Sequence, residues 1–453
     1  MWSIPQRPIV MPIALALLLL AGASPTSAQD AAPRDELVLP LQQEHVHGST
    51  IEELPNGDLL VAWFQGSGER WADDVRIMGA RRKAGADRWS DPFVLADVEG
   101  FPDINPVLFV DPRQRLWLLW YTVIANQWET SLLKYRISED YLDLLGAPEW
   151  DWQADLHVRP GGSGERGIQA GDPFVRSVRE QADAYAAAAE GVDSAAIAGW
   201  KARILAGARG EDMVRAGRIP RADGGYDEAQ LGYPYFRRMG WQSRAKPFIT
   251  DAGRIIVPLY SDGFSFSLMA YSDDGGERWS FSNPLVGAGN IQAAIARAPG
   301  GELVAYMRDN GPAPKRLHVS RSADGGTTWS LVQDSELPNP GSAADIVTLD
   351  SGHWVLIYND TERGRHSLAV ALSEDGGQTW PWRRHLELDE GETPRTAEYP
   401  AIIQGRDGRL HATYSYVVPG EGRTVKWVRF GEEWLRLQGT ESGDDLQGPA
   451  LQQ

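Results

Sequence analysis

The sequence contains no cysteine, so disulfide bonds cannot contribute to its stability. It is also short of positive charge, with 44 Lys and Arg side chains against 62 Asp and Glu and a formal net charge of −18. Binding to nucleic-acid phosphates or to an anionic membrane surface requires clustered Lys and Arg. The composition therefore argues against both as partners, while a locally basic pocket inside an acidic protein stays compatible with it.

Long apolar runs are lacking too, with one exception near the N-terminus. Arg7 precedes the apolar run "IVMPIALALLLLAGA", and the small-residue stretch "SPTSAQ" follows. The run is shorter than the ~20 residues that a membrane span needs. The pattern predicts a signal peptide over residues 1–28, cleaved after Ala28, with Ala23 as the alternative site. We therefore expect a periplasmic or secreted protein without a membrane span in the mature chain, stable by packing alone.

Glycine, proline and tryptophan are abundant, at 48, 29 and 18 residues, which favours turns and β-structure. One turn recurs three times, as "YSDDGGERWSF" from Tyr271, "RSADGGTTWSL" from Arg321 and "LSEDGGQTWPW" from Leu372. Ser272 and Ser322 are 50 residues apart, and Ser322 and Ser373 are 51 apart. A constant period near 50 indicates repeated supersecondary units.

A second motif, a turn followed by an apolar strand, occurs in phase with the first. Its six copies are "PNGDLLVAWF", "PRQRLWLLWY", "DAGRIIVPLY", "PGGELVAYMR", "DSGHWVLIYN" and "DGRLHATYSY". Units of short strands without helices between them cannot bury their faces alone, so they must stack in a line or a ring. Four strands in about 50 residues fit the blade of a β-propeller.

We therefore predict an all-β fold, a six-bladed β-propeller over residues 36–434. The predicted blades span 44–98, 99–155, 240–286, 287–336, 337–390 and 391–434, and a strand at Glu36–Pro40 closes the ring by joining the last blade. Residues 176–221 are Ala-rich and charged, which predicts a helical insertion between blades 2 and 3. This insertion could be a lid, an oligomer contact or a surface decoration. The polar tail at 440–453 is predicted to be disordered.

The repeated turn is predicted to be structural. Its Asp can accept hydrogen bonds from nearby backbone N–H groups, its glycines allow positive φ, and its Trp can pack between neighbouring sheets. Three copies at equivalent positions around a ring cannot all face one central site in the same role. The chemistry must therefore come from other residues.

The repeated turn resembles the Asp-box, or BNR repeat, of sialidases and related propellers. In addition, "HGSTIEELPNGDLLVAWF", "INPVLF", "LPNPGSAAD" and "EYPAII" together resemble the bacterial BNR-repeat sialidase-like group. The resemblance covers roughly residues 44–434 apart from the insertion. It implies an exo-α-sialidase-type hydrolase that binds a terminal acidic sugar by its carboxylate, with three arginines, a Tyr nucleophile with a Glu partner, and an Asp acid. It implies neither a cofactor nor a metal.

Three residues match the sialidase pattern. Arg308 in "AYMRDNG" and Arg365 in "ERGRHSL" match the second and third arginines, and a guanidinium suits a carboxylate because it can donate two parallel hydrogen bonds. Tyr399 in "AEYPAII" matches the nucleophile. The stretch "GSGERWADDVRI" contains Glu69, and its Asp73 and Asp74 are our candidates for the general acid.

Two positions depart from the sialidase pattern. His47 or Gly48 stands where the first arginine is expected, and Gln292 stands where the Glu partner of the nucleophile is expected. A neutral amide cannot take the phenolic proton. The resemblance to the sialidase-like group implies that further residues gather near the axis with the arginines, namely His47, Asn105, Lys246, Gln292 and Asn339.

These departures leave two alternatives to hydrolysis. One is a polysaccharide lyase in which His47 or Tyr399 removes the proton next to a uronic acid carboxylate. The other is a glycan-binding propeller without catalysis. His45 and His47 also have metal-ligand spacing, but alternation along a strand puts both on one face without any metal, and we predict no metal site.

Overall fold

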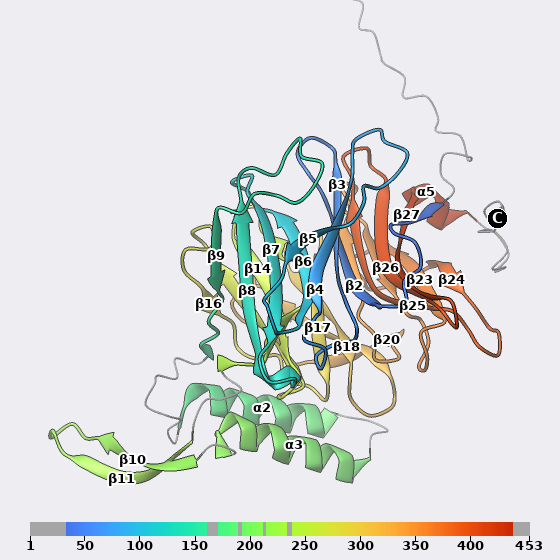
Figure 1. The fold of residues 1–453 in the computed structure, drawn as a ribbon. Coiled ribbons are helices and arrows are strands. Elements are labelled where there is room, and N and C mark those ends of the chain that lie inside the picture. The colour runs from blue at the N-terminus through green and yellow to red at the C-terminus, as the bar shows by residue number, and fades with distance from the viewer. Residues whose placement is uncertain (1–32, 161–170, 189–192, 212–213, 233–237, 438–453) are drawn as a thin grey trace, which may run out of the picture.

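The computed structural model describes residues 33–160, 171–188, 193–211, 214–232 and 238–437. The predicted signal peptide (1–28) and tail (440–453) lie outside the described residues. Within the described part, six antiparallel sheets form the blades of a propeller, as predicted (Figure 1). Among the described helices, none combines the length and apolar character that a bilayer span requires.

In each blade the first strand lies nearest the axis, and these inner strands contact one another around the ring. Blade 1 consists of β2 (His45–Glu53), β3 (Leu59–Gly66), β4 (Arg76–Arg82) and β5 (Phe93–Ala96). Blade 2 consists of β6 (Asp103–Val110), β7 (Leu116–Val123), β8 (Ser131–Ser138) and β9 (Trp152–Asp155), with the short 3₁₀ helix η1 (Trp128–Thr130) before β8.

Blade 3 has a broken inner strand. It consists of β12 (Trp241–Ser243), β13 (Phe248–Ile249), β14 (Ile255–Ser261), β15 (Phe266–Ser272) and β16 (Ser280–Phe281), and both β12 and β13 pair with β14. Blade 4 is regular in order, with β17 (Asn290–Arg297), β18 (Leu303–Asp309), β19 (Arg316–Ser322) and β20 (Gln333–Pro338). Blade 5 follows with β21 (Asp345–Thr348), β22 (Trp354–Tyr358), β23 (Ser367–Ser373) and β24 (Trp382–Leu388).

The last blade is completed by a strand from the other end of the chain. It consists of β25 (Thr396–Gln404), β26 (Leu410–Val418), β27 (Gly422–Phe430) and β1 (Arg34–Leu37), and it is followed by the helix α5 (Glu432–Arg436). β1 pairs antiparallel with β27, from Arg34 opposite Arg429 to Leu37 opposite Lys426. The ring is therefore closed as predicted, although the closing strand begins two residues before the predicted Glu36–Pro40.

The insertion between blades 2 and 3 contains both helices and strands. Figure 1 shows α2 (Pro173–Ala188) and α3 (Ser194–Ala208) side by side at one end of the propeller, and the hairpin of β10 (Val214–Pro220) and β11 (Tyr226–Gly232) pointing away from it. The helical insertion predicted over 176–221 therefore contains two helices, and its last residues form the strand β10 instead. Gly210, with φ of 63°, follows the last helical turn, and a tight turn at Arg221–Gly225 pairs the strands.

The Asp-box turns (272–279, 322–329 and 373–380) are structural, as predicted. In the second of them, Asp324 Oδ1 accepts hydrogen bonds from Thr327 N at 3.1 Å, Thr328 N at 2.9 Å and Ser322 Oγ at 2.9 Å. The same serine accepts a hydrogen bond from Gly326 N at 2.9 Å. Because these bonds favour the charged carboxylate, they lower the pKa of Asp324 against the opposing effect of burial.

The second glycine of each Asp-box turn packs against the preceding blade. A Cβ at that glycine would come closer than 3.0 Å to a side chain there: Trp117 for Gly276, Ile256 for Gly326 and Tyr306 for Gly377. The Trp of the first turn continues the contact, since the rings of Trp279 and Trp117 lie 6.5 Å apart. The Asp-box turns therefore join neighbouring blades.

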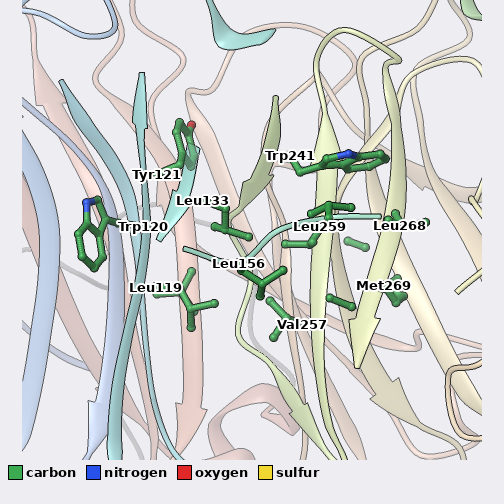
Figure 2. Close-up of a cluster of buried hydrophobic side chains, with 14 of the residues drawn as sticks. Leu119, Trp120, Tyr121, Leu133, Leu156, Trp241, Val257, Leu259, Leu268 and Met269 are labelled. Atoms are coloured by element: carbon green, nitrogen blue, oxygen red, sulfur yellow. The ribbon is translucent and has the colours of Figure 1, made fainter. Parts of the chain in front are cut away.

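Apolar side chains fill the space between blades, and the largest such cluster spans blades 1 to 4 and the insertion. Figure 2 shows the part of it between blades 2 and 3, where Leu119 and Leu133 face Val257 and Leu259. All four are almost fully buried. Burial of a side chain of this size stabilises a fold by roughly 1.5–3 kcal/mol, which explains how the protein can dispense with disulfides.

Replacement of Gly276 by Ala tests the role of the Asp-box turns in packing. Gly276 has φ of 91°, and its new Cβ would overlap the Trp117 ring. We expect the free energy of unfolding to fall by about 2–5 kcal/mol, the sum of about 1–2 for the left-handed backbone and about 1–3 for overpacking. Gly253→Ala is the matched control, because φ there is 81° and the added Cβ meets open space. Urea denaturation showing equal losses for both variants would contradict the packing role.

Candidate active site

Four inner strands depart from regular pairing at the same point. The pairing register shifts once in each of β2, β6, β17 and β25, where two residues stand opposite one. The first residue of each bulge has a positive φ, 68° for Gly48, 49° for Asn105, 57° for Gln292 and 52° for Tyr399. Such β-bulges redirect side chains and are frequent next to active sites.

The bulges border a cavity of about 230 Å³ to which every blade contributes, so it lies on the propeller axis. Asn105, Gln292 and Tyr399 line it. A left-handed backbone is strained for these three residue types, so the surrounding structure must hold them in place. The wall also contains other polar and charged residues, among them His45, His47, Glu69, Tyr260, Asp262, Arg308, Arg365, Glu398 and Arg423.

Tyr399 is surrounded by cations. Arg308 Nη1 donates a hydrogen bond to Tyr399 Oη at 2.8 Å, and Gln292 Nε2 donates a second at 3.4 Å. The guanidinium carbons of Arg244, Arg308 and Arg365 lie 5.1, 5.9 and 5.4 Å from the centroid of the Tyr399 ring. Positive groups that are already oriented in this way stabilise negative charge developing on the phenolic oxygen.

Arg244 holds two of the bulges together. Its side chain is almost fully buried, and it donates hydrogen bonds to the backbone oxygens of Ser49 at 3.2 Å, Pro400 at 3.1 Å and Tyr399. Burial lowers the pKa of Arg244. These buried carbonyls need a hydrogen-bond donor from the protein, and the guanidinium of Arg244 is that donor. The contact also links the bulge of blade 1 to that of blade 6.

His47 lies against Tyr399, with the two ring centroids 4.3 Å apart. Burial lowers the pKa of His47 well below its usual value, and the charges of His45, Arg365 and Arg244 lower it further. The imidazole is therefore neutral near pH 7. Its Nδ1 has no hydrogen-bond partner among the described residues, and Glu398 Oε2 lies 3.9 Å away. A neutral imidazole next to a phenol can accept a proton from it.

Three carboxyl groups line the cavity, those of Glu69, Asp262 and Glu398. Burial raises the pKa of Asp262 to about 6, and the charge of Glu129 adds to this, while Arg308 acts against it. Burial also acts to raise the pKa of Glu69, but its contact with His45, whose Nε2 lies 3.3 Å from Glu69 Oε1, lowers that pKa overall. Glu398 is paired with Arg365 at 2.5 Å. Asp262 can therefore hold a proton up to about pH 6.

The structure brings together six of the predicted site residues: His47, Asn105, Gln292, Arg308, Arg365 and Tyr399. It does not bring Asp73 or Asp74 to the cavity, which corrects the predicted position of the acid. Both are exposed, and Asp74 accepts hydrogen bonds from the backbone and hydroxyl of Ser67. The loop bends after Glu69, so it is Glu69 and not the aspartates that reaches the wall.

Two other predicted residues have different positions from those expected. Lys246 pairs with Glu52 at 2.7 Å and lines a separate cavity of about 440 Å³. The break between β12 and β13 explains this, because alternation along one strand would have put Lys246 on the same face as Arg244. Asn339 caps a turn instead, since its Oδ1 accepts hydrogen bonds from the N–H groups of Gly341 and Ser342 at 3.0 and 3.2 Å.

Sequence reasoning missed Arg244 and Asp262 and did not select Glu398. A signal for Asp262 was present, because it stands two residues after the apolar-strand motif "DAGRIIVPLY", while Arg308 ends the copy in blade 4. All six copies end on the same side of the ring, so residues just after them are candidates for the cavity wall. For metals, no group of three or more His, Asp or Glu side chains in the described chain is arranged to hold an ion.

Comparisons with known proteins bear on the family and the fold of this chain. Residues 57–164 and 242–412 match the family described as "BNR repeat-like domain". A sialidase from Bacteroides fragilis is 31% identical over 130 residues, and an anhydrosialidase from Macrobdella decora is 37% identical over 183 residues. These matches span 27% and 36% of the chain and only 23% of the length of either relative. An intramolecular trans-sialidase structure from Ruminococcus gnavus, 15% identical, superposes with a TM-score of 0.55 over 89% of this chain and 98% of that one, which shows a common fold.

The raised pKa of Asp262 predicts a pH-dependent stability difference. Since the folded state disfavours the charged carboxylate, stability is lost as pH rises from about 4 to about 6, and the loss is complete above that. Asp262→Asn removes this loss, so its free energy of unfolding relative to the parent should rise by about 3 kcal/mol between pH 4 and pH 8. Denaturation at both pH values measures this.

The control for this experiment is Asp74→Asn. Hydrogen bonds from Ser67 lower the pKa of Asp74 despite the opposing effect of burial, so its replacement should bring no gain at pH 8. A pH-independent effect of Asp262→Asn would contradict the assignment of a raised pKa to this residue.

Proposed function

The chain belongs to the BNR repeat-like domain family, and we propose that it is an exported sialidase-like glycosidase that removes a terminal acidic sugar at the axial cavity. The observation that carries this proposal is the environment of Tyr399. Its phenolic oxygen accepts a hydrogen bond from Arg308 at 2.8 Å, and three guanidinium groups surround its ring. A tyrosine in such surroundings is suited to act as a nucleophile.

An acidic sugar fits the charges of the cavity wall. Arg308, Arg365 and Arg423 line the cavity, and a buried carboxylate needs partners of this kind to offset its loss of water. Arg308 Nη2 donates only a 3.3 Å hydrogen bond, to the exposed Asn310, so a sugar carboxylate can displace this contact at little cost. The small volume favours one sugar residue, and hence action at a chain end.

The proposed reaction has two steps. Tyr399 Oη attacks the anomeric carbon while its proton passes to the neutral His47, and the protonated Asp262 donates its proton to the leaving oxygen. Water then attacks the anomeric carbon and gives a proton to the Asp262 carboxylate, the bond from this carbon to Tyr399 Oη breaks, and the phenolate recovers its proton from His47. Gln292, which cannot take a proton, holds the phenolic oxygen in position through its amide.

A second function, elimination from a uronic acid glycan, is favoured by one observation. The partners of the Tyr399 oxygen are Arg308 and Gln292, and no carboxylate among the described residues is hydrogen-bonded to it. The group beside it is the neutral His47, as a β-elimination requires. In that case His47 or Tyr399 would remove the proton next to the carboxylate, and the arginines would stabilise the resulting negative charge.

A substrate panel with Tyr399→Phe tests the proposal. The purified protein is assayed on fluorogenic sialosides, fluorogenic keto-deoxy-octulosonate glycosides and uronate polymers. We expect release of the fluorophore from an acidic glycoside, and loss of the nucleophile should lower kcat by about 10³-fold or more. Tyr271→Phe is the matched control, because Tyr271 lies outside the cavity against Arg254 and its ring contact needs no hydroxyl.

The other outcomes separate the alternatives. An absorbance rise from an unsaturated uronate, with no fluorophore released, would identify a lyase. Binding of acidic glycans without turnover of any substrate would identify a glycan-binding propeller. Full activity of Tyr399→Phe on an acidic glycoside would rule out the proposed mechanism.

A further inference from the structure

The insertion has no counterpart in the family match, which stops at residue 164 and resumes at 242. Its first helix, α2, nevertheless packs onto the propeller next to the cavity. The ring of Phe174, in the first turn of α2, lies 5.7 Å from that of Phe264 and 6.5 Å from that of Phe266. All three rings are almost fully buried. The helix therefore rests on the turn between β14 and β15.

That turn has one side toward the cavity and one toward α2. Asp262 lines the cavity, while Phe264, two residues later, is fully buried against Phe174. The turn is tight, with Ser265 at φ of 60° and its N–H donating to Ser261 O at 2.6 Å. Because so few residues separate the two side chains, a displacement of Phe264 must also move Asp262.

The middle of α2 contacts the segment that leads into blade 4. Gln181 Oε1 accepts a hydrogen bond from Val286 N at 3.1 Å in a buried position. This segment continues to Gly289, whose backbone oxygen accepts a hydrogen bond from Asn310 N at 2.7 Å. Asn310 follows closely after Arg308. One helix thus braces both the turn that carries Asp262 and the strand end that carries Arg308.

We propose that α2 is a positioning element for the active site, with Phe174 and Gln181 as positioning residues that hold Asp262 in register with Arg308 and Tyr399. The catalytic meaning of this inference rests on the proposed function, but the placement of Asp262 does not. Besides burial, the groups that act on the pKa of Asp262 are the charges of Arg308, Glu129 and Arg70 and the amide of Gln242. The uncharged phenol of Tyr260 lines the same cavity. Loosening the turn would admit water to Asp262. Water would weaken both the effect of burial and the effects of these groups on the pKa of Asp262.

The test measures the titration of Asp262 through stability, so it needs no substrate. The free energy of unfolding is measured by denaturation from pH 4 to pH 8 in four pairs of proteins. Each pair consists of a chain with Asp262 and the same chain with Asp262→Asn. The four pairs differ at position 174, which is Phe174 in the first and Phe174→Leu, Phe174→Val or Phe174→Ala in the others. The pH above which the difference stops changing gives the titration midpoint of Asp262 in the folded protein. We expect Phe174→Ala to move this midpoint from about 6 to lower pH by about one unit, because hydration of the carboxyl reverses the effect of burial. Phe174→Leu should keep the midpoint, and Phe174→Val should lie between.

Trp200→Leu is the control for a general loosening of the insertion. Trp200 of α3 packs against Tyr185 of α2, with ring centroids 5.6 Å apart, and makes no ring contact with the 261–266 turn. It should lower the melting temperature without moving the midpoint. An unmoved midpoint in Phe174→Ala would overturn the positioning role, and if that variant does not fold, an unmoved midpoint in Phe174→Val would do the same.

Activity provides a second readout. On any acidic glycoside that the parent hydrolyses, Phe174→Ala should lower kcat about tenfold, change KM by less than about twofold, and move the alkaline limb of the pH profile to lower pH. A parent without glycosidase activity would contradict the proposed function alone. An unchanged pH profile in an active Phe174→Ala would contradict the positioning role alone.

Discussion

The site depends on a backbone constraint, the alternation of side chains along a strand. A regular inner strand would send its side chains in turn toward one neighbouring blade and then the other. The bulges at Gly48, Asn105, Gln292 and Tyr399 interrupt that alternation at one level of the ring and border a common cavity. Arg244 ties two of the bulges through backbone carbonyls, so a buried charge from blade 3 holds the bulge of blade 1 and the strained bulge at Tyr399 in blade 6. The strain is located where the chemistry is proposed, as is usual for functional sites.

The charges in the cavity follow from this geometry. The arginines surround Tyr399, Glu398 neutralises part of their charge through Arg365, and His47 is kept neutral by burial and by its cationic neighbours. Asp262 enters from blade 3 with a raised pKa. A nucleophile stabilised by cations, a neutral base and a protonated acid together make up what a two-step glycoside cleavage requires. The insertion, which the family match does not include, packs against the turn that carries Asp262.

Much of the fold could be predicted from the sequence, because the 50-residue period and the six apolar-strand motifs are local signals. The residues in those motifs or in the inner strands, such as Arg308 and Tyr399, were also identified. The failures came from positions set by tertiary structure. Asp73 and Asp74 lie beyond a bend in their loop, and a break in an inner strand separates Lys246 from Arg244. The β-hairpin in the insertion was also missed, because helix was predicted as far as residue 221, whereas α3 ends at Ala208 and β10 begins at Val214. Buried groups such as Arg244 carry no composition signal at all.

The central claim is that Tyr399, held on its bulge among the arginines, is the nucleophile. It is tested most directly by mass spectrometry of the intact protein after reaction with a fluorinated glycosyl fluoride of the acidic sugar that the protein accepts. Such reagents slow the second step, so the sugar–enzyme bond accumulates. The account predicts one added sugar per chain, mapped by peptide sequencing to Tyr399. A protein that hydrolyses the sugar but carries no adduct, or carries it on another residue, would contradict the account.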